Sequence, residues 1–182
     1  ALRTNGTGWA WGYNVYGQVG DGSTTQRNSP VQCAALSGIR SLSAGYYHNL
    51  AVKSDGTVWG WGYNVYGQCG GSGPTKSTPG QVSGIAGVTN AAVGYWHSLA
   101  AKTNGTAWAW GYGYYGQLGT GLVGWDASST TPVQVTNLTQ VTGVAGQGFG
   151  SMAWIAGSQP TPPNRPPGIQ SGSLWMYEDQ AA

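Results

Sequence analysis

Two histidines and two cysteines are the residues of this chain best suited to metal binding or nucleophilic chemistry. His48 and His97 recur 49 residues apart, at matching places in two similar segments. Because the pair is equivalent by repetition, we expect both rings to fix the local backbone and not to catalyse. Cys33 and Cys69 stand where related segments carry Val or Leu, which predicts two buried thiols, with a disulfide between them left open. The spacings of these four residues match no zinc-binding pattern.

The five carboxylates do not form a catalytic set either. Asp55 is the turn residue of "SDGT", and the matching turns carry Asn. Asp21 lies in a Gly-Asp-Gly turn, and Asp126 lies in a short insertion. Only Glu178 and Asp179 are adjacent, near the end of the chain. With no Gly-x-Ser-x-Gly and no phosphate-binding loop, the sequence predicts no catalytic residue, no cofactor and no metal.

Three tandem repeats of about 50 residues must position these side chains. The same motif occurs three times, as "GWAWGYNVYGQVG", "VWGWGYNVYGQCG" and "AWAWGYGYYGQLG". We divide residues 1–157 into repeats at 1–50, 51–99 and 100–157. Fixed periods of this length are typical of propellers and other repeat folds. Aligning the copies places three tryptophan pairs in register, and we expect them to pack between neighbouring blades: Trp9, Trp11, Trp59, Trp61, Trp108 and Trp110.

Each repeat is predicted to form a four-stranded unit. An Asn-Gly or Asp-Gly turn precedes every tryptophan pair, which is the strongest short-range signal for a hairpin. Two further strands, around 39–44 and 47–53, complete the unit in the first repeat. The chain is rich in Gly, Trp, Tyr, Val and Thr, which favours an all-β fold. We therefore expect β-propeller blades, with three repeats forming an incomplete ring or an arc.

A wider pattern points to a known family. Asn/Asp-Gly-Thr-x-Trp-x-Trp-Gly-x-Asn-x-x-Gly-Gln-x-Gly, then Pro-Val-Gln and Gly-Tyr-x-His-Ser-Leu-Ala, closely resembles the repeats of the regulator of chromosome condensation family. The resemblance covers residues 1–157 and implies a propeller, typically of seven blades, whose blades are staggered against the sequence repeats. It also implies nucleotide exchange on a small GTPase, enzyme inhibition or protein binding. The corresponding loops here are nearly uncharged, so no exchange-factor residue can be carried over.

Composition limits the partners and the compartment. Only 7% of residues are charged and the net charge is +2, which predicts no nucleic-acid partner. No apolar stretch approaches the roughly 20 residues of a membrane span, so we expect no membrane insertion. The chain starts at Ala1 in the middle of the repeat pattern. We expect it to be a piece of a longer extracellular or cell-surface protein, with bacteria as the expected source.

The C-terminal segment differs in composition from the repeats. Residues 158–168 are Pro-rich and predict a stiff, extended linker. Residues 169–182 are expected to form a docking strand or the start of a following module, and the segment resembles the beginning of bacterial cadherin-like or immunoglobulin-like surface modules. Its apolar side chains suggest docking on a sheet edge. They are Leu174, Trp175, Met176 and Tyr177.

Tyrosines in the loops that follow the tryptophan pairs are the candidate binding residues. Tyr and Asn on one rim could stack on sugars or anchor a protein, or each loop could pack against the next blade. We favour packing for the repeat-invariant Tyr16, Tyr66 and Tyr115. The insertion at 121–129 breaks the repeat pattern and suggests a specific contact. The candidates for binding or assembly are Tyr13, Tyr63, Tyr112, Tyr114, Trp125 and Asp126.

The sequence thus favours a non-catalytic structural or adhesive segment. It would act through protein contact or self-assembly, with other copies or missing blades of the same parent chain as partners. A head-to-tail contact that does not close would build a filament. One alternative is a platform that regulates a globular partner such as a small GTPase or an enzyme. Another is lectin-like binding of a glycan.

Overall fold

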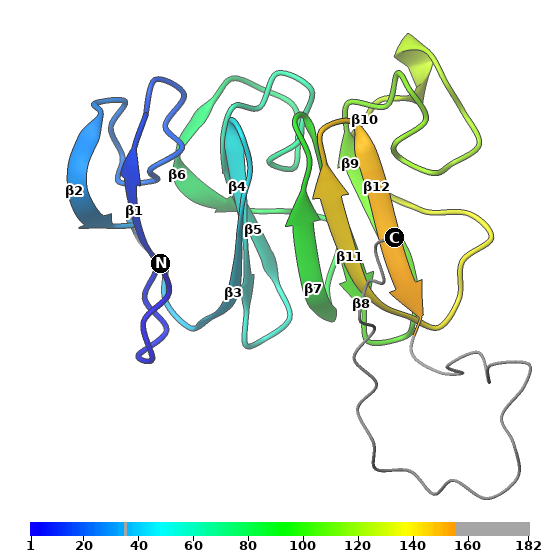
Figure 1. Cartoon of the computed structure of the whole chain (residues 1–182), viewed down its shortest axis with the longest axis horizontal. Helices are drawn as coiled ribbons and strands as arrows, with labels where there is room; N and C mark the ends of the chain where they lie inside the picture. The colour runs from blue at the N-terminus through cyan, green and yellow to red at the C-terminus, as the bar shows by residue number, and fades with distance from the viewer. Residues whose placement is uncertain (35, 156–182) are drawn as a thin grey trace, which may run out of the picture.

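The fold is built from antiparallel sheets, as the computed structural model shows for residues 1–34 and 36–155 (Figure 1). The one helical element among these residues is a 3-10 turn, η1 (Trp125–Ala127), so none of them form a helix able to cross a membrane. The strands are β1 (Trp9–Gly12), β2 (Arg27–Gln32), β3 (Ile39–Ala44), β4 (His48–Lys53), β5 (Val58–Gly62), β6 (Lys76–Gln81), β7 (Val88–Val93), β8 (His97–Lys102), β9 (Ala107–Gly111), β10 (Ser129–Gln134), β11 (Val141–Gln147) and β12 (Gly150–Ile155).

Two of the four sheets are complete propeller blades and two are halves. Strands β3-β4-β5-β6 form one four-stranded blade, and β7-β8-β9-β10 form the next. Among the described residues, β1 pairs with β2, as β5 pairs with β6, so this sheet corresponds to the outer half of a blade. In the same part of the chain β11 pairs with β12, as β3 pairs with β4, so this sheet corresponds to an inner half. The all-β prediction and the incomplete propeller are both confirmed.

The blades are staggered against the sequence repeats. The predicted strands at 39–44 and 47–53 exist as β3 and β4, but they do not complete a unit with the tryptophan strand of the first repeat. They pair with β5 and β6, which follow them in the chain. The reason is local, because the tight turn at Asp55-Gly56 joins β4 to β5 and makes those two strands a hairpin. The stagger that the family resemblance implied is therefore present.

The hairpin turns carry a hydrogen-bond relay that explains the Asp/Asn-Gly-Thr-x-Trp motif. The Thr57 amide and hydroxyl both donate to Oδ1 of Asp55, at 3.0 and 2.6 Å. The Trp59 indole N–H donates in turn to the Thr57 hydroxyl at 3.1 Å. Gly56 takes a φ of 78°, which is costly for residues with a Cβ. The same relay recurs in the first and third hairpins, so the motif fixes both the turn and the first tryptophan.

The hydrophobic core is divided into slabs between adjacent sheets. Leu50 and Val58 of one blade share a cluster with Val88 and Trp110 of the next. A second cluster joins the blade of β7–β10 to β11, and a third joins the first half-blade to the blade of β3–β6. Each blade is thus stabilised mainly by its neighbours in the arc. The expectation that tryptophans pack between blades holds for Trp59, Trp61, Trp108 and Trp110. It is wrong for Trp11, which is 54% exposed.

Candidate functional site

The repeated histidines join neighbouring blades. His48 Nε2 lies 2.9 Å from the hydroxyl of Ser98, which donates to the main-chain carbonyl of Gln68 at 2.8 Å. The Trp110 indole donates to the same carbonyl at 2.9 Å. Burial lowers the pKa of His48 to about 3, so the ring is neutral near pH 7. The sequence suggested a purely local backbone role, whereas the contact runs between blades because the equivalent serine stands on the next inner strand.

The second histidine repeats this geometry at the last half-blade. His97 Nε2 lies 2.9 Å from the hydroxyl of Ser151, which donates to the Gln117 carbonyl at 2.7 Å. Burial lowers the pKa of His97 to about 4. Two neutral, buried imidazoles that each contact a serine of the adjacent blade are structural elements. Within residues 1–34 and 36–155, Nδ1 of each ring has no hydrogen-bond partner, whereas a nucleophilic triad would place an acid there.

The remaining reactive side chains also have structural roles. Cys33 and Cys69 are free and buried, in the apolar positions that the repeat alignment predicted. Burial raises the pKa of Cys69 to about 12, which leaves it without nucleophilic thiolate. Asp21 accepts hydrogen bonds from Ser23 and from Arg27, at 2.6 Å, within its own loop. Among the residues that the structure describes, no three His, Cys, Asp or Glu side chains cluster as a metal site would require.

What gathers on one side of the molecule is a continuous aromatic surface. The loops after the tryptophan strands and the tips of the inner hairpins all lie along the upper side in Figure 1. Their rings contact one another with centroids 4.5 to 6.4 Å apart, mostly edge to face. The aromatic surface comprises Tyr13, Tyr16, Tyr46, Tyr47, Tyr63, Tyr66, Tyr95, Trp96, Tyr112, Tyr114, Tyr115, Trp125 and Phe149.

The repeat-invariant tyrosines link blades within this surface. The Tyr16 ring meets Tyr63 of the next blade edge to face, with centroids 5.0 Å apart. Tyr66 repeats the contact with Tyr112 at 4.8 Å, and Tyr115 packs against Phe149 at 5.2 Å. Packing against the next blade, which we expected for these three tyrosines, is what the structure shows.

The predicted binding tyrosines differ in exposure. Tyr13 is 55% exposed and Tyr114 is 36% exposed, so both can contact a partner. Tyr112 is only 6% exposed and supports the rings above it. Tyr63 is half-buried, and burial together with neighbouring tyrosines raises its pKa. Burial likewise raises the pKa of Tyr112, with smaller effects from its tyrosine neighbours.

Sequence reasoning missed the exposed rings at the tips of the inner hairpins. Tyr46 is 65% exposed and Tyr95 is 42% exposed. Both follow the glycine of Gly-Tyr-x-His, so the signal was present. The motif served only for the family resemblance, because only the tertiary structure brings these tips beside the loops of the tryptophan strands.

The insertion has a structural part and an exposed part. Asn64 holds its loop by accepting from the Cys69 amide at 2.7 Å and donating to a carbonyl. In the third repeat this position is Gly113, where a Cβ would overlap the Ala127 carbonyl. The insertion backbone therefore takes the space of the missing asparagine. Trp125, 68% exposed, projects beside Tyr114 with ring centroids 5.0 Å apart.

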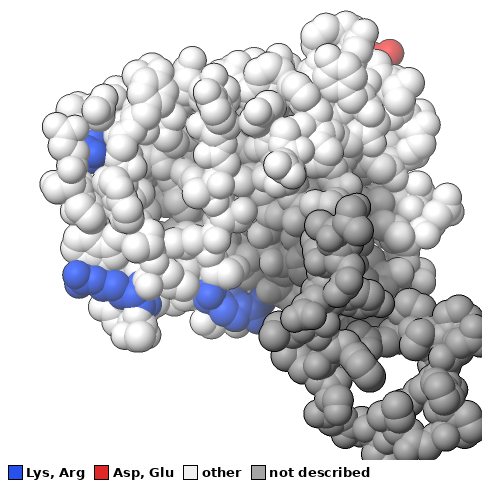
Figure 2. Space-filling model, in the orientation of Figure 1, with Lys and Arg blue, Asp and Glu red and all other residues white. Residues whose placement is uncertain are grey.

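Charge separates the two sides of the molecule. Figure 2 shows Lys and Arg mainly along the lower edge, with Asp or Glu visible only at the upper right. The lower hairpins each set a cation over the first tryptophan of the pair, such as Lys53 over Trp59 at 5.4 Å and Arg3 over Trp9 at 4.4 Å. On the side of the aromatic surface, Asp21 and Arg27 pair with each other in the first loop, and exposed Asp126 lies in the insertion.

Family models agree with this architecture. The model described as regulator of chromosome condensation (RCC1) repeat matches residues 5–52, 55–101 and 104–154. A second model with the same description matches residues 39–68 and 88–117. The chain belongs to the RCC1 repeat family. A search of curated proteins returned no match.

Solved structures show the same fold at low identity. Prp20p from Saccharomyces cerevisiae, studied for binding to Gsp1p and histones, gives a TM-score of 0.72 at 23% identity, over 81% of this chain and 39% of its own. Human WBSCR16 gives a TM-score of 0.73 at 21% identity, over 85% of this chain and 42% of its own. Yeast RCC1 (Prp20) bound to Kap60 gives a TM-score of 0.70 at 22% identity, over 85% of this chain and 38% of its own. This RCC1-repeat chain spans about two-fifths of the structures it matches.

The C-terminal predictions lie outside the described residues. The linker at 158–168 and the docking strand or module start at 169–182 are therefore untested. The same holds for the resemblance to cadherin-like or immunoglobulin-like modules. The untested assembly candidates are Leu174, Trp175, Met176 and Tyr177.

Proposed function

We propose that this RCC1-repeat segment is a non-catalytic protein-binding platform whose contact region is the aromatic surface. The observation that carries the proposal is the continuity of that surface across the whole arc. It runs from Tyr13 in the first half-blade to Phe149 in the last, and both ends are exposed. Monomeric proteins rarely leave a large apolar patch uncovered unless it binds something.

The geometry of the rings suits a protein partner. Aromatic residues are enriched at the cores of protein interfaces, where charged residues are depleted. Tyrosine offers a large apolar face and a hydroxyl while losing little side-chain entropy on binding. Ring-to-ring contacts such as Tyr46 to Tyr95, 5.5 Å between centroids, already order the exposed side chains. Because less ordering remains to be done on binding, affinity rises.

A partner of low charge fits this surface best. The alternative that the chain regulates a small GTPase or an enzyme draws on Prp20p, which is reported to bind Gsp1p and histones. Here the nearest acids offer little to such partners. Asp21 is paired with Arg27 in its own loop, and Asp126 stands alone at one end of the surface. We therefore favour contacts made by apolar and hydrogen-bonding groups.

We also propose an extracellular or cell-surface setting in a bacterial parent protein, in an adhesive or structural role. The support is the composition, with 7% charged residues and strong tandem repetition. Mild proteolysis of intact source cells, followed by detection with antiserum to this segment, tests the location. Loss of the signal is expected, and full protection in intact cells with loss only after lysis would contradict it.

The binding test removes exposed rings without touching buried ones. The variant Tyr46→Ser, Tyr95→Ser, Tyr115→Ser deletes three exposed rings from the aromatic surface. A matched control, Lys53→Ser with Lys102→Ser, alters the opposite side. Both variants and the unaltered chain are immobilised and exposed to a displayed peptide library and, in parallel, to a glycan array. We expect peptides that bind the unaltered chain and the control, and lose at least about tenfold in affinity for the triple variant.

The outcomes separate the classes of ligand. Peptide binding that the tyrosine variant loses supports the platform. Glycan binding lost by the same variant, without any peptide signal, would overturn it in favour of a lectin-like role. Ligands that bind all three proteins equally would show that the aromatic surface is not the contact. Ligands that bind the unaltered chain and the tyrosine variant but not the lysine variant would show the same.

A second candidate function, structural self-assembly, rests on the two half-blades. Uncovered strand edges and apolar faces invite pairing with another chain. Trp11 on β1 is 54% exposed, and Met152 on β12 is 59% exposed. Light scattering across a range of chain concentrations tests this function. A particle of one chain, 18.8 kDa, at every concentration would exclude it.

A further inference from the structure

We infer that the partner of the aromatic surface is an apolar protein segment that carries one arginine, and that this arginine docks at the insertion between β9 and β10. The inference rests on the platform proposed above, because it names the partner chemistry of the same surface. The docking site is the insertion corner, which we define by its exposed side chains: Tyr114, Tyr115, Leu122, Val123, Trp125 and Asp126. Four features separate this corner from the rest of the aromatic surface.

The first feature is the ordered backbone of the insertion. The Gly124 amide donates to the Tyr114 carbonyl at 2.8 Å, and the Gly113 amide donates to the Ser128 hydroxyl at 3.0 Å. Between these two contacts, the turn η1 buries Ala127. Both ends of η1 are therefore tied to the loop that follows β9, and the exposed side chains project from a fixed backbone.

The second feature is the number of exposed apolar side chains. Leu122 is 59% exposed, Val123 is 74% exposed and Trp125 is 68% exposed. With the two neighbouring tyrosines, the loop between β9 and β10 exposes five large hydrophobic side chains, whereas the equivalent loop between β5 and β6 exposes one, Val65. Binding energy concentrates where exposed Trp and Tyr cluster on an interface. We therefore expect the corner to be the main anchor of a partner.

The third feature is the support of the Trp125 ring. Tyr114 and Tyr112 both meet it edge to face, with centroids 5.0 and 6.0 Å away. Tyr112 is buried and lies parallel to Tyr114, with centroids 6.2 Å apart. The indole is thus packed against two rings while most of its surface stays in solvent. Such a ring attracts a cation, and the planar guanidinium of arginine can stack on it.

The fourth feature is the charge of Asp126. Among the three acids that the structure describes, Asp21 pairs with Arg27 at 2.6 Å and Asp55 pairs with Lys53 at 3.8 Å. Asp126 is exposed and forms no ion pair with any described residue. Arginine suits a carboxylate beside an exposed indole, because its guanidinium can stack on a ring and also donate two hydrogen bonds to a carboxylate.

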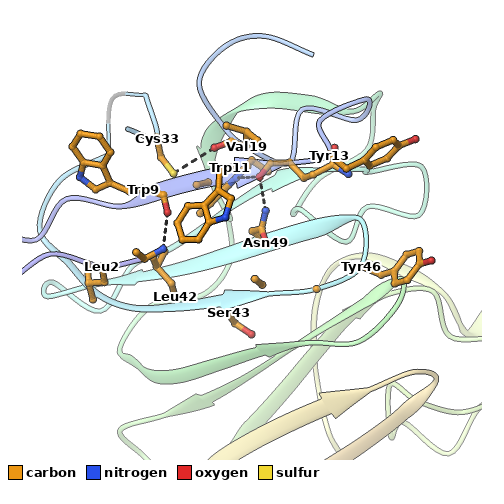
Figure 3. Close-up of a pocket in the computed structure, with 16 residues that line it drawn as sticks. Leu2, Trp9, Trp11, Tyr13, Val19, Cys33, Leu42, Ser43, Tyr46 and Asn49 are labelled. Carbon is orange, nitrogen blue, oxygen red and sulfur yellow. Dashed lines mark hydrogen bonds between the residues drawn. The ribbon is translucent and has the colours of Figure 1, made fainter. Parts of the chain in front are cut away.

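The opposite end of the aromatic surface lacks this combination. Figure 3 shows Tyr13 projecting from the loop after β1 and Tyr46 projecting from the tip between β3 and β4. Both rings are exposed and can contact apolar groups. The acid of the same loop, Asp21, already accepts hydrogen bonds from Ser23 and Arg27. The arginine of a partner is therefore assigned to the insertion corner and not to this end.

A track of exposed rings leads from the corner across the inner hairpin tips. Neighbouring centroids along it are 5.0 to 5.5 Å apart, and every ring is at least 36% exposed. In order, the rings are Trp125, Tyr114, Tyr115, Phe149, Tyr95 and Tyr46. The apolar side chains of the partner lie along this track. A second cation there would be buried without a carboxylate, which is costly, so one arginine at the corner end is the expected pattern.

The test begins with the displayed peptide library used for the proposed function. Peptides are selected on the unaltered chain, and the strongest binders are synthesised both with their arginine and with glutamine in its place. We expect selected peptides to be enriched in an arginine beside apolar residues. The glutamine forms should bind the unaltered chain at least about fivefold more weakly.

The variant Asp126→Asn removes the charge of the corner and keeps its size. It should weaken binding of the arginine peptide at least about fivefold and leave the glutamine peptide within about twofold. The matched control, Asp55→Asn, removes one acid from the lower side. It should leave the binding of both peptides unchanged, and it should fold normally because the equivalent turns already carry Asn5 and Asn104.

The contribution of the indole is measured with Trp125→Ser. Tyr13→Ser is the matched control, because it removes a ring that is also more than half exposed but lies at the far end of the surface. Trp125→Ser should weaken binding of the arginine peptide at least about tenfold, and Tyr13→Ser by less than about threefold.

The outcomes separate the inference from the platform. Selected peptides without enriched arginine would overturn the inference, and so would an arginine preference that Asp126→Asn leaves unchanged. Equal losses for Trp125→Ser and Tyr13→Ser would also overturn it. In each of these cases, peptide binding that is lost with Tyr46→Ser, Tyr95→Ser, Tyr115→Ser would leave the platform standing. No peptide binding to the unaltered chain would overturn both.

Discussion

The complete blades and the half-blades carry equivalent residues, but the exposure of these side chains differs between them. Trp11 and Trp61 occupy the same place in consecutive repeats. Each is the second tryptophan of its pair and follows a small residue, Ala10 or Gly60. Trp61 is buried against the preceding repeat and donates to its glutamine carbonyl, whereas Trp11 is half exposed. The difference teaches that the local sequence makes the strand, while the neighbouring sheet decides whether its side chains form a core.

The same contrast explains why one blade is not a stable unit by itself. The core clusters lie between sheets, and the polar contacts of His48 and Trp110 also cross from one blade to the next. Stability in such an array is close to a sum of nearest-neighbour contacts. Each end unit has one neighbouring sheet among the described residues, so we expect the end units to open most easily within that part of the chain.

The largest expected difference between the two regions concerns tryptophan truncation. Trp110→Ala should lower the free energy of unfolding by about 3–5 kcal/mol, because it leaves a cavity between complete blades. Trp11→Ala should cost much less at low chain concentration, since that ring is already half exposed. Urea unfolding of both variants, followed by tryptophan fluorescence, measures the difference. Equal losses would contradict the contrast, and a Trp11→Ala loss that grows with concentration would sharpen it in favour of assembly.

A smaller difference is expected at a pair of equivalent glycines. Gly62 and Gly12 have φ values of 103° and 107°, so alanine strains the backbone at both, at about 1 kcal/mol. A Cβ at Gly62 would also collide with the Tyr47 carbonyl, while at Gly12 nothing lies within 4 Å. Gly62→Ala should therefore cost about 2 kcal/mol more than Gly12→Ala. Thermal melts of the two variants provide the check, and identical melting temperatures would refute the packing difference.

Near neutral pH the smallest expected effect comes from the two histidines, and it grows as the pH falls. Their pKa values fall from 6.5 in the unfolded chain to about 3 for His48 and about 4 for His97. Only the unfolded chain takes up protons below pH 6.5, so their contribution to stability is complete above that pH. It declines as the pH falls towards the folded pKa values, by up to about 1.4 kcal/mol per pH unit for each histidine.

Unfolding between pH 6.5 and 5 isolates this effect, because the lowered pKa values of Asp21 and Asp55 place their titration below that window. His48→Gln and His97→Gln should each flatten the pH dependence. A pH dependence unchanged in both variants would show that the rings are not buried in their neutral form.

Several features of the fold were predictable from short stretches of sequence. The Asn-Gly and Asp-Gly turns specified the hairpins, and the alternation around the tryptophan pairs specified the strands that follow them. The equivalence of Cys69 with Val and Leu specified a buried thiol. These features depend on backbone preferences and on residues a few positions apart, so one repeat contains the information for them.

The pairing of strands into blades was harder to assign. The prediction grouped β3 and β4 with the first tryptophan strand because all three lie in one sequence repeat. It overlooked the short turn at Asp55-Gly56, which joins β4 to β5 instead. The contact between His48 and Ser98 was also beyond reach, since the two residues are 50 positions apart and meet only when two blades pack.

The sequence by itself determined the hairpins, the repeat length and the all-β class. The tertiary structure decided which members of each equivalent set are buried. Tyr112 supports the aromatic surface while Tyr114, two residues away, reaches solvent, and Trp110 is enclosed while Trp11 is open. The physical reason is that hydrogen-bonded turns are local, whereas burial requires a neighbouring sheet, which the described residues place on both sides of a blade at the centre of the arc.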